Sequence, residues 1–182
     1  ADPAEYDVVI AAGPRFISDD VYLSDTLVAL KETFLQEQYA SLGVYDAVVL
    51  DVGASVGDSA IYFARKGAAM VFAYEPFERT AHRALVNVRR NGLADFIEIE
   101  AVAVGAASGY AGSETFKSTM QTEVDGAAVG EDPIVGSTRV VAAADIVRKL
   151  ADNYPEKRIV CKLDCEGGEY AILDALDRSG LV

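Results

Sequence analysis

The sequence predicts a doubly wound α/β fold, in which helices cover both faces of a central parallel sheet. Apolar runs rich in β-branched residues alternate along the chain with segments of helical periodicity, which is the order of a βαβαβ unit. The runs are almost continuously apolar, as expected for strands buried on both faces. With 182 residues, of which 51% are hydrophobic and 25% charged, the chain has the size and composition of one globular domain.

Residues 1–44 are expected to form an N-terminal extension. Short apolar runs at 7–12 and 15–17, separated by a Gly-Pro pair, predict a β-hairpin. From Ser24 onward apolar residues recur with helical spacing as far as Gly43, which predicts a single helix with a charged outer face. The extension is thus expected to supply short strands and one helix beside the main sheet.

Residues 45–182 are expected to form the core domain, with strands and helices in alternation. The predicted strands cover 47–52, 69–74, 96–104 and 159–164, and the predicted helices cover 58–65, 77–91, 143–150 and 170–177. Residues 106–137 lack a clear periodicity and are expected to form a long loop with one or two short strands, for example over 114–116, a stretch that lies outside the residues described below. Right-handed crossovers place the carboxyl ends of such strands along one edge of the sheet, where ligands bind.

The charge of the chain bears on its partners. Its formal net charge is −13, from 16 Lys and Arg against 29 Asp and Glu, so it repels phosphate backbones and anionic membrane surfaces at long range. No apolar run approaches the roughly 18 residues of a membrane span. We therefore expect neither a nucleic-acid nor a membrane partner. The oligomeric state is not indicated.

Two cysteines bear on the redox environment. Cys161 lies in the predicted strand 159–164 and Cys165 directly follows it, and four residues of extended chain span about 13 Å. A disulfide allows a Cα separation of only about 7 Å. The thiols are therefore expected to be free, which suits a reducing, cytoplasmic location.

A glycine-rich turn, Asp51–Gly57, follows the first core strand, at the place where such sheets bind ligands. The dinucleotide fingerprint G-x-G-x-x-G fits it poorly, because Ser55 replaces the second glycine and Asp51 puts negative charge where a pyrophosphate would lie. The nucleophile elbow G-x-S-x-G matches residues 53–57 literally. Its triad, however, needs a histidine late in the chain, and the single histidine is His82.

S-adenosylmethionine fits the charge of this turn, because it carries a sulfonium and an ammonium group and no phosphate. The Asp51 carboxylate could accept a hydrogen bond from the amino-acid moiety of this cofactor, directly or through water. Glu75, after the second strand, could accept hydrogen bonds from the two ribose hydroxyls. The alternative is that these two acids only cap strand ends. The candidate cofactor residues, of which the last two are expected beside the adenine, are Asp51, Gly53, Ala54, Ser55, Val56, Gly57, Asp58, Glu75, Pro76, Val102 and Ala103.

Several motifs together resemble a known family. The segment Val49–Ser59 resembles motif I of class I methyltransferases. Further segments resemble the FkbM-type subgroup of these enzymes, namely Tyr74-Glu75-Pro76, Asn87, Asn91-Gly92 and Lys162–Glu169. The resemblance implies a Rossmann-like class I methyltransferase sheet, S-adenosylmethionine as cofactor, and O-methylation of hydroxyls on sugars or polyketide-type products. A full class I domain has seven strands, so either the last strands are missing at the C-terminus or the N-terminal strands fill an edge of the sheet.

In the fold that the resemblance implies, the fourth core strand ends beside the transferable methyl group. That strand ends at Asp164, and Glu166 lies two residues further on, so regular strand geometry points both the same way. We expect these two acids to be catalytic, as general base and acceptor anchor. A divalent cation is the other chemistry, but no third acid ligand is evident, so no metal site is predicted. The structural alternative is that both acids and Glu169 cap the final helix.

Three function classes stay open at this point. The leading one is an S-adenosylmethionine-dependent methyltransferase with a hydroxylated small-molecule acceptor. An RNA methyltransferase is the second, although the acidic charge and the lack of an Asn-Pro-Pro-aromatic motif count against it. The third is a relative that binds the adenosyl ligand without transferring methyl groups. An NAD-dependent enzyme is disfavoured by Asp51 and Ser55.

Overall fold

The computed structural model describes the chain except for residues 1–4, 11–12, 20–22, 113–136 and 166. Its centre is a four-stranded parallel sheet with the strand order β5-β4-β3-β9. The strands are β3 (Val48–Val52), β4 (Met70–Tyr74), β5 (Ile97–Glu100) and β9 (Ile159–Leu163). The predicted parallel sheet is confirmed.

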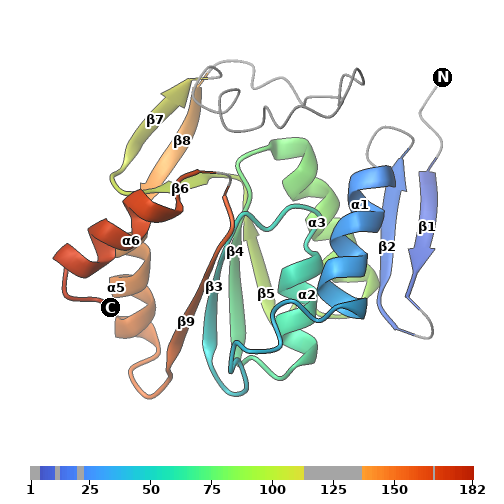
Figure 1. Ribbon diagram of the computed structural model, residues 1–182, viewed down its shortest axis with the longest axis horizontal. Coiled ribbons are helices and arrows are strands. Elements are labelled where there is room, and N and C mark those ends of the chain that lie inside the picture. Colours follow the sequence, from blue (N-terminus) through green and yellow to red (C-terminus); the bar gives the residue numbers. More distant parts are fainter. Residues whose placement is uncertain (1–4, 11–12, 20–22, 113–136, 166) are drawn as a thin grey trace.

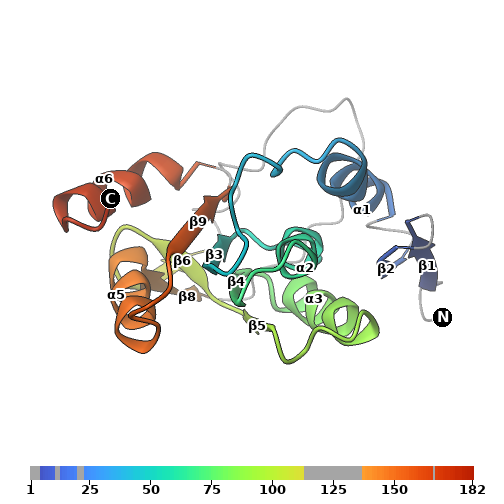
Figure 2. The same cartoon turned by 90° about the horizontal axis from the view of Figure 1, so that it is seen from below.

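Helices cover both faces of this sheet, as Figure 1 and Figure 2 show. One face is covered by α2 (Asp58–Arg65) and α3 (Glu78–Arg90), and the other by α5 (Ala143–Asn153) and α6 (Glu169–Arg178). Each of the four begins within one residue of its predicted start. The doubly wound, Rossmann-like fold class is therefore confirmed.

Strand β3 shows why the core runs are continuously apolar. All five of its residues are buried, and successive side chains point to opposite faces. Val49 packs into the core beneath α2 and α3, whereas Val48, Leu50 and Val52 pack into the core beneath α5 and α6. The alternation puts Asp51 on the α2 face, which decides its partners in the site.

The N-terminal segment forms a hairpin and a helix that is shorter than predicted. Strands β1 (Glu5–Val9) and β2 (Arg15–Asp19) pair antiparallel, as expected for the hairpin. Helix α1 (Leu23–Leu30) continues as the π-helix η1 (Lys31–Leu35) and ends there, so the prediction of one helix as far as Gly43 was wrong. The chain turns instead at Glu37, whose φ of 49° is left-handed.

The third predicted strand is in fact two strands in different sheets. β5 ends at Glu100, and β6 (Ala103–Gly105) joins β8 (Ser137–Ala142) and β7 (Gly109–Gly112) in a three-stranded sheet of order β6-β8-β7. The prediction of one strand over 96–104 was therefore wrong. Both β7 and β8 lie at the ends of the segment expected to be a loop, and β8 directly precedes α5.

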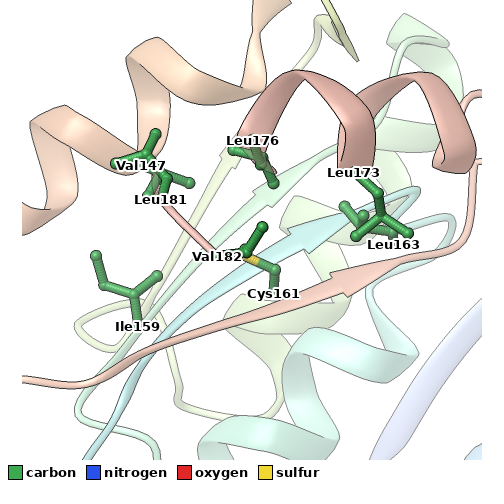
Figure 3. Close-up of a pocket in the computed structure, with 8 residues that line it drawn as sticks. All are labelled: Val147, Ile159, Cys161, Leu163, Leu173, Leu176, Leu181 and Val182. Carbon is green, nitrogen blue, oxygen red and sulfur yellow. The ribbon is translucent and has the colours of Figure 1, made fainter. Parts of the chain in front are cut away.

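β9 is the outer strand of the central sheet within the described part of the chain. The N-terminal strands pair with each other in a separate sheet, so the alternative in which they fill an edge of the central sheet is wrong. An apolar cavity of about 270 Å³ lies beside β9, between α5 and α6 (Figure 3), and is lined by Val147, Ile159, Cys161, Leu163, Leu173, Leu176, Leu181 and Val182. None of the candidate site residues lines it. Among the helices described, none is long and apolar enough to cross a membrane.

Candidate functional site

The candidate site lies at the carboxyl ends of β3, β4 and β9. The glycine turn after β3 is fastened to its neighbour, because the backbone N–H groups of Gly53 and Ala54 both donate to the Tyr74 carbonyl at 3.0 Å. On the other side, the Asp164 N–H donates to the Val52 carbonyl at 3.1 Å. The turn, the end of β4 and the end of β9 therefore form one connected edge.

Gly53 is required by the closeness of two backbones. Its φ of 78° is left-handed, and a Cβ atom placed on it would lie 1.9 Å from the carbonyl oxygen of Asp164. The turn therefore packs directly on the chain that follows β9, which carries the candidate base. Ser55 is also left-handed, with a φ of 47°.

We expect Gly53→Ala to destabilise the protein by about 3 kcal/mol or more, because the left-handed strain adds to the displacement of the Asp164 backbone. The matched control is Gly92→Ala. Gly92 has a φ of 67°, but a Cβ there meets nothing within 4 Å, so its cost is about 1 kcal/mol. Urea unfolding of both variants checks this, and equal losses would contradict the close approach.

Asp51 forms a fully buried ion pair with Lys162. The two residues are directly opposite each other in the parallel register of β3 and β9, and the Lys162 Nζ atom lies 3.1 Å from Asp51 Oδ1. The side chains are 0% and 4% exposed. The Ser59 hydroxyl donates to the other carboxylate oxygen of Asp51 at 2.6 Å. Two partners thus compensate the buried charge.

The Lys162 ammonium also contacts the backbone of the glycine turn. It donates to the Gly53 carbonyl at 2.7 Å and approaches the Val52 carbonyl at 3.3 Å. Burial lowers the pKa of Lys162, but the negative charges of Asp51 and Asp164 outweigh burial, so its pKa lies above the ordinary value. The ammonium is therefore charged and is held against the turn by these contacts.

The predicted contact between Asp51 and the amino-acid moiety of the cofactor stays a prediction. In the structure its carboxylate faces Ser59 and Lys162 rather than solvent. Its Oδ1 atom has no partner of hydrogen-bond geometry among the described residues, although the Lys162 Nζ atom forms an ion pair with it at 3.1 Å.

Glu75 ties the end of β4 to the glycine turn. One carboxylate oxygen accepts from the Ser55 N–H at 3.0 Å, and the other accepts from the Phe77 N–H at 3.1 Å. The residue is 6% exposed. Burial raises the pKa of Glu75 to about 7, although the two backbone N–H groups act in the opposite direction.

The remaining cofactor candidates lie around the same edge. Val102 packs with Val52 and Tyr74, at the ends of β3 and β4. Asp58 opens α2 and accepts from the Thr33 hydroxyl at 2.6 Å, and burial raises the pKa of its carboxyl. The others are mostly buried, Pro76 only in part, and are Ala54, Val56, Gly57, Pro76 and Ala103. Their contacts with a cofactor stay predictions.

Asp164, the first candidate catalytic residue, is the exposed member of the cluster. Its side chain is 59% exposed, and its Oδ2 atom accepts from the Tyr39 hydroxyl at 3.2 Å. Lys162 Nζ lies 3.8 Å from the same oxygen. Glu166, the second candidate, lies outside the described residues. The described residues contain no group of three or more His, Cys, Asp or Glu side chains placed to hold a metal ion.

Glu169 fastens the loop that precedes α6 and does not cap the helix. Its carboxylate accepts from the backbone N–H groups of Cys165 at 2.7 Å and Gly167 at 2.9 Å, whereas the N-cap of α6 is Gly168, which has no side-chain cap. Cys165 is a free cysteine, as is Cys161. Burial, and then the negative charge of Glu169, raises the pKa of the Cys165 thiol to about 11, so it stays protonated.

Tyr39 is a site residue that the sequence did not reveal. The sequence predicted that Tyr39 lies on a regular helix over 24–43. It lies instead in the turns after η1, where its hydroxyl contacts Asp164, 125 residues away in the sequence. The position of Lys162 could have been found from its spacing, because a lysine two residues before Asp164 on a strand shares its face.

The sequence comparisons decide the family. The model of the Methyltransferase FkbM domain matches residues 51–181. The chain belongs to the FkbM methyltransferase domain family. The resemblance found in the sequence is therefore confirmed, and the cofactor of this family is S-adenosylmethionine. The matched range begins at Asp51 and thus contains the glycine turn, Glu75 and Asp164, but leaves Tyr39 outside.

One curated relative matches almost the whole of this chain. The AMB antimetabolite synthetase AmbE of Pseudomonas aeruginosa (strain PAO1) is 29% identical over 187 residues. The match covers 97% of this chain but only 8% of AmbE. The chain therefore spans less than a tenth of the length of this curated relative.

Solved structures with partial similarity are also methyltransferases by description. The SAM-dependent methyltransferase from Agrobacterium tumefaciens is 15% identical, with a TM-score of 0.41, over 57% of this chain and 34% of that one. The structure of PRMT6-SAH is 26% identical, with a TM-score of 0.34, over 44% of this chain and 22% of that one.

Proposed function

We propose that this FkbM domain transfers the methyl group of S-adenosylmethionine to a hydroxyl oxygen of a small-molecule acceptor such as a sugar. The observation that carries the proposal is the exposed Asp164 carboxylate beside the glycine turn. A hydroxyl must lose its proton as it is methylated, and a carboxylate at this place can take it.

The residues at the turn fit the cofactor chemically. Glu75 lies at the end of β4, and each of its carboxylate oxygens has a second acceptor position for a ribose hydroxyl. Once Glu75 is ionised above pH 7, the negative charges of Asp51 and Glu75 exceed the single positive charge of Lys162, which favours a cationic ligand over a pyrophosphate. When bound, S-adenosylmethionine supplies an electrophilic methyl group on its sulfonium.

The chain's own residues have separate tasks in this proposal. Glu75 binds the ribose, and the turn residues Gly53–Gly57 let the backbone approach the ligand closely. Lys162 fixes the turn through the Gly53 carbonyl and neutralises Asp51. Asp164 removes the acceptor proton, and Glu166 anchors the acceptor. Alignment of the two reactants at this edge supplies the rest of the rate enhancement.

A small-molecule acceptor is favoured over RNA. The formal charge of −13 opposes binding of a phosphate backbone. The relative AmbE is, by its name, an antimetabolite synthetase, which places a matching domain in a protein that makes a small molecule. Free cysteines support our further proposal of a reducing, cytoplasmic location.

Methyl transfer from methyl-tritiated S-adenosylmethionine tests the proposal. The acceptors are a panel of sugars and hydroxylated polyketide-type compounds, with total RNA as the alternative. We expect label on a hydroxylated compound, and a loss of about 100-fold or more in Asp164→Asn. The control Asp174→Asn removes an exposed acid of α6 that pairs with Arg178 and leaves the rate unchanged. Label on RNA, or an active Asp164→Asn variant, would contradict the proposal.

A further inference from the structure

Two contacts to the candidate site come from the N-terminal segment, outside the range that the family match covers. The match begins at residue 51. The Thr33 hydroxyl, in η1, reaches Asp58 at 2.6 Å, and the Tyr39 hydroxyl reaches Asp164 at 3.2 Å. The family match therefore assigns no role to either residue, although both touch acids of the site.

The ring of Tyr39 has contacts of its own, apart from the hydrogen bond of its hydroxyl. It packs against Phe63 with a centroid separation of 5.4 Å and against Tyr62 at 6.4 Å, both on α2. The Lys162 Nζ atom lies 5.8 Å from its ring centroid. These contacts fix the direction of the hydroxyl without help from the hydrogen bond itself.

We propose that Tyr39 is a positioning residue of the methyl-transfer site: with Lys162 it holds the Oδ2 atom of Asp164, so that the carboxylate is oriented toward the acceptor hydroxyl. The inference rests on the proposed function, in which Asp164 is the base. It assigns a part of the catalytic arrangement to the turns after η1, a segment that precedes the family domain in the sequence.

The charges around Asp164 agree with this role. Both contacts are made to Oδ2, while the side chain is 59% exposed and so accessible to an acceptor. Lys162 on β9 brings a positive charge, part of which is neutralised by Asp51 on β3 behind it. Burial, and then the negative charge of Asp164, raises the pKa of the Tyr39 phenol above its ordinary value, so the hydroxyl remains a donor.

The test replaces the hydroxyl alone. Tyr39→Phe keeps the ring and its packing, and removes the donor to Asp164. Without that donor the exposed Asp164 side chain should leave its single orientation and populate more than one χ1 rotamer. Three-bond couplings in NMR spectra of aspartate-labelled protein measure the χ1 populations, with the Asp164 signal assigned by its loss in Asp164→Asn.

The matched control is Tyr45→Phe, in the same segment. Tyr45 is 79% exposed, so this change should leave the χ1 populations of Asp164 as in the wild type. Unchanged Asp164 χ1 populations in Tyr39→Phe would overturn the inference. Once an acceptor is known, kcat should fall by about 10-fold in Tyr39→Phe, with the KM for S-adenosylmethionine unchanged.

The test separates this inference from the proposed function. The NMR measurement requires neither cofactor nor acceptor, so it reports on Tyr39 even if methyl transfer fails. Conversely, wild-type protein that transfers no methyl group but shows the Tyr39-dependent orientation of Asp164 would overturn the proposed function and keep the hydrogen-bonded arrangement. A thermal melt of Tyr39→Phe close to wild type is expected, because the aromatic contacts with Phe63 and Tyr62 are kept.

Discussion

Replacing Lys162 with methionine is expected to lower the free energy of unfolding by about 3–5 kcal/mol. The methionine fills the same space but leaves the carboxylate of Asp51 buried without a positive partner. It also removes the donor to the Gly53 carbonyl, so the glycine turn loses its support. Chemical denaturation measures the loss, and calorimetry with S-adenosylhomocysteine should show that ligand binding weakens with it.

Two further variants make this prediction specific. Lys149→Met removes an exposed lysine of α5 and should change stability by less than about 0.5 kcal/mol. The double variant Asp51→Asn with Lys162→Met removes both charges and should recover at least about 2 kcal/mol of the loss, because no unpaired charge is left buried. A Lys162→Met protein as stable as Lys149→Met would contradict the buried pair.

Glu75→Gln is expected to weaken binding of S-adenosylhomocysteine by about 10- to 100-fold, since hydrogen bonds to a charged acceptor are the strong ones. Because the pKa of Glu75 is raised to about 7, wild-type affinity should increase as the pH rises through 7 and the carboxyl ionises. The variant cannot ionise, so its affinity should stay flat over that range. Titration calorimetry from pH 6 to 8 measures both.

The same group makes stability depend on pH with the opposite sign. Below its ordinary value of 4.5 Glu75 is protonated in both states, whereas between 4.5 and about 7 only the folded protein keeps the proton. The free energy of unfolding should therefore fall as the pH rises from 5 to 7, by about 2 kcal/mol. This fall should be absent in Glu75→Gln and present in a variant of an exposed acid.

Glu78→Gln provides that comparison, because Glu78 is an exposed acid in the first turn of α3. It should bind S-adenosylhomocysteine like wild type and keep the wild-type fall in stability between pH 5 and 7. If Glu75→Gln shows the same pH profile as Glu78→Gln, burial of an uncharged carboxyl at the end of β4 is not the cause.

The central sheet could be predicted because its sequence signals are strong and local. β3 is five buried residues in a row, a pattern that few structures other than a parallel strand produce. The helices that follow such strands start at glycine turns and acidic first turns, as at Asp58. These signals need no knowledge of the neighbours in space.

The parts that were missed depend on partners far away in the sequence. β6 and β8 are short and pair with each other across a gap of more than 30 residues, so no local periodicity marks them. The π-helix that ends α1 early puts Thr33 on Asp58, and this buried contact outweighs the helical spacing of the apolar residues nearby.

The sequence predicted which residues lie at the site better than it predicted which of them contact one another. Gly53 and Glu75 follow from their places at strand ends, and both lie at the edge expected. The pairing of Asp51 with Lys162 requires the strand order, since β3 and β9 are neighbours in space but about 110 residues apart in sequence. Tyr39 required in addition the course of the N-terminal segment across the end of β9.

Calorimetric titration of the wild-type protein at pH 8 with S-adenosylhomocysteine, and separately with NAD, tests most directly whether the glycine turn after β3 is an adenosyl-methionine site. At this pH Glu75 is ionised and can accept the ribose hydroxyls. We predict a dissociation constant on the order of 1 µM for S-adenosylhomocysteine and no detectable binding of NAD. Binding of NAD without S-adenosylhomocysteine would contradict the assignment of the turn, and the proposed methyl transfer with it.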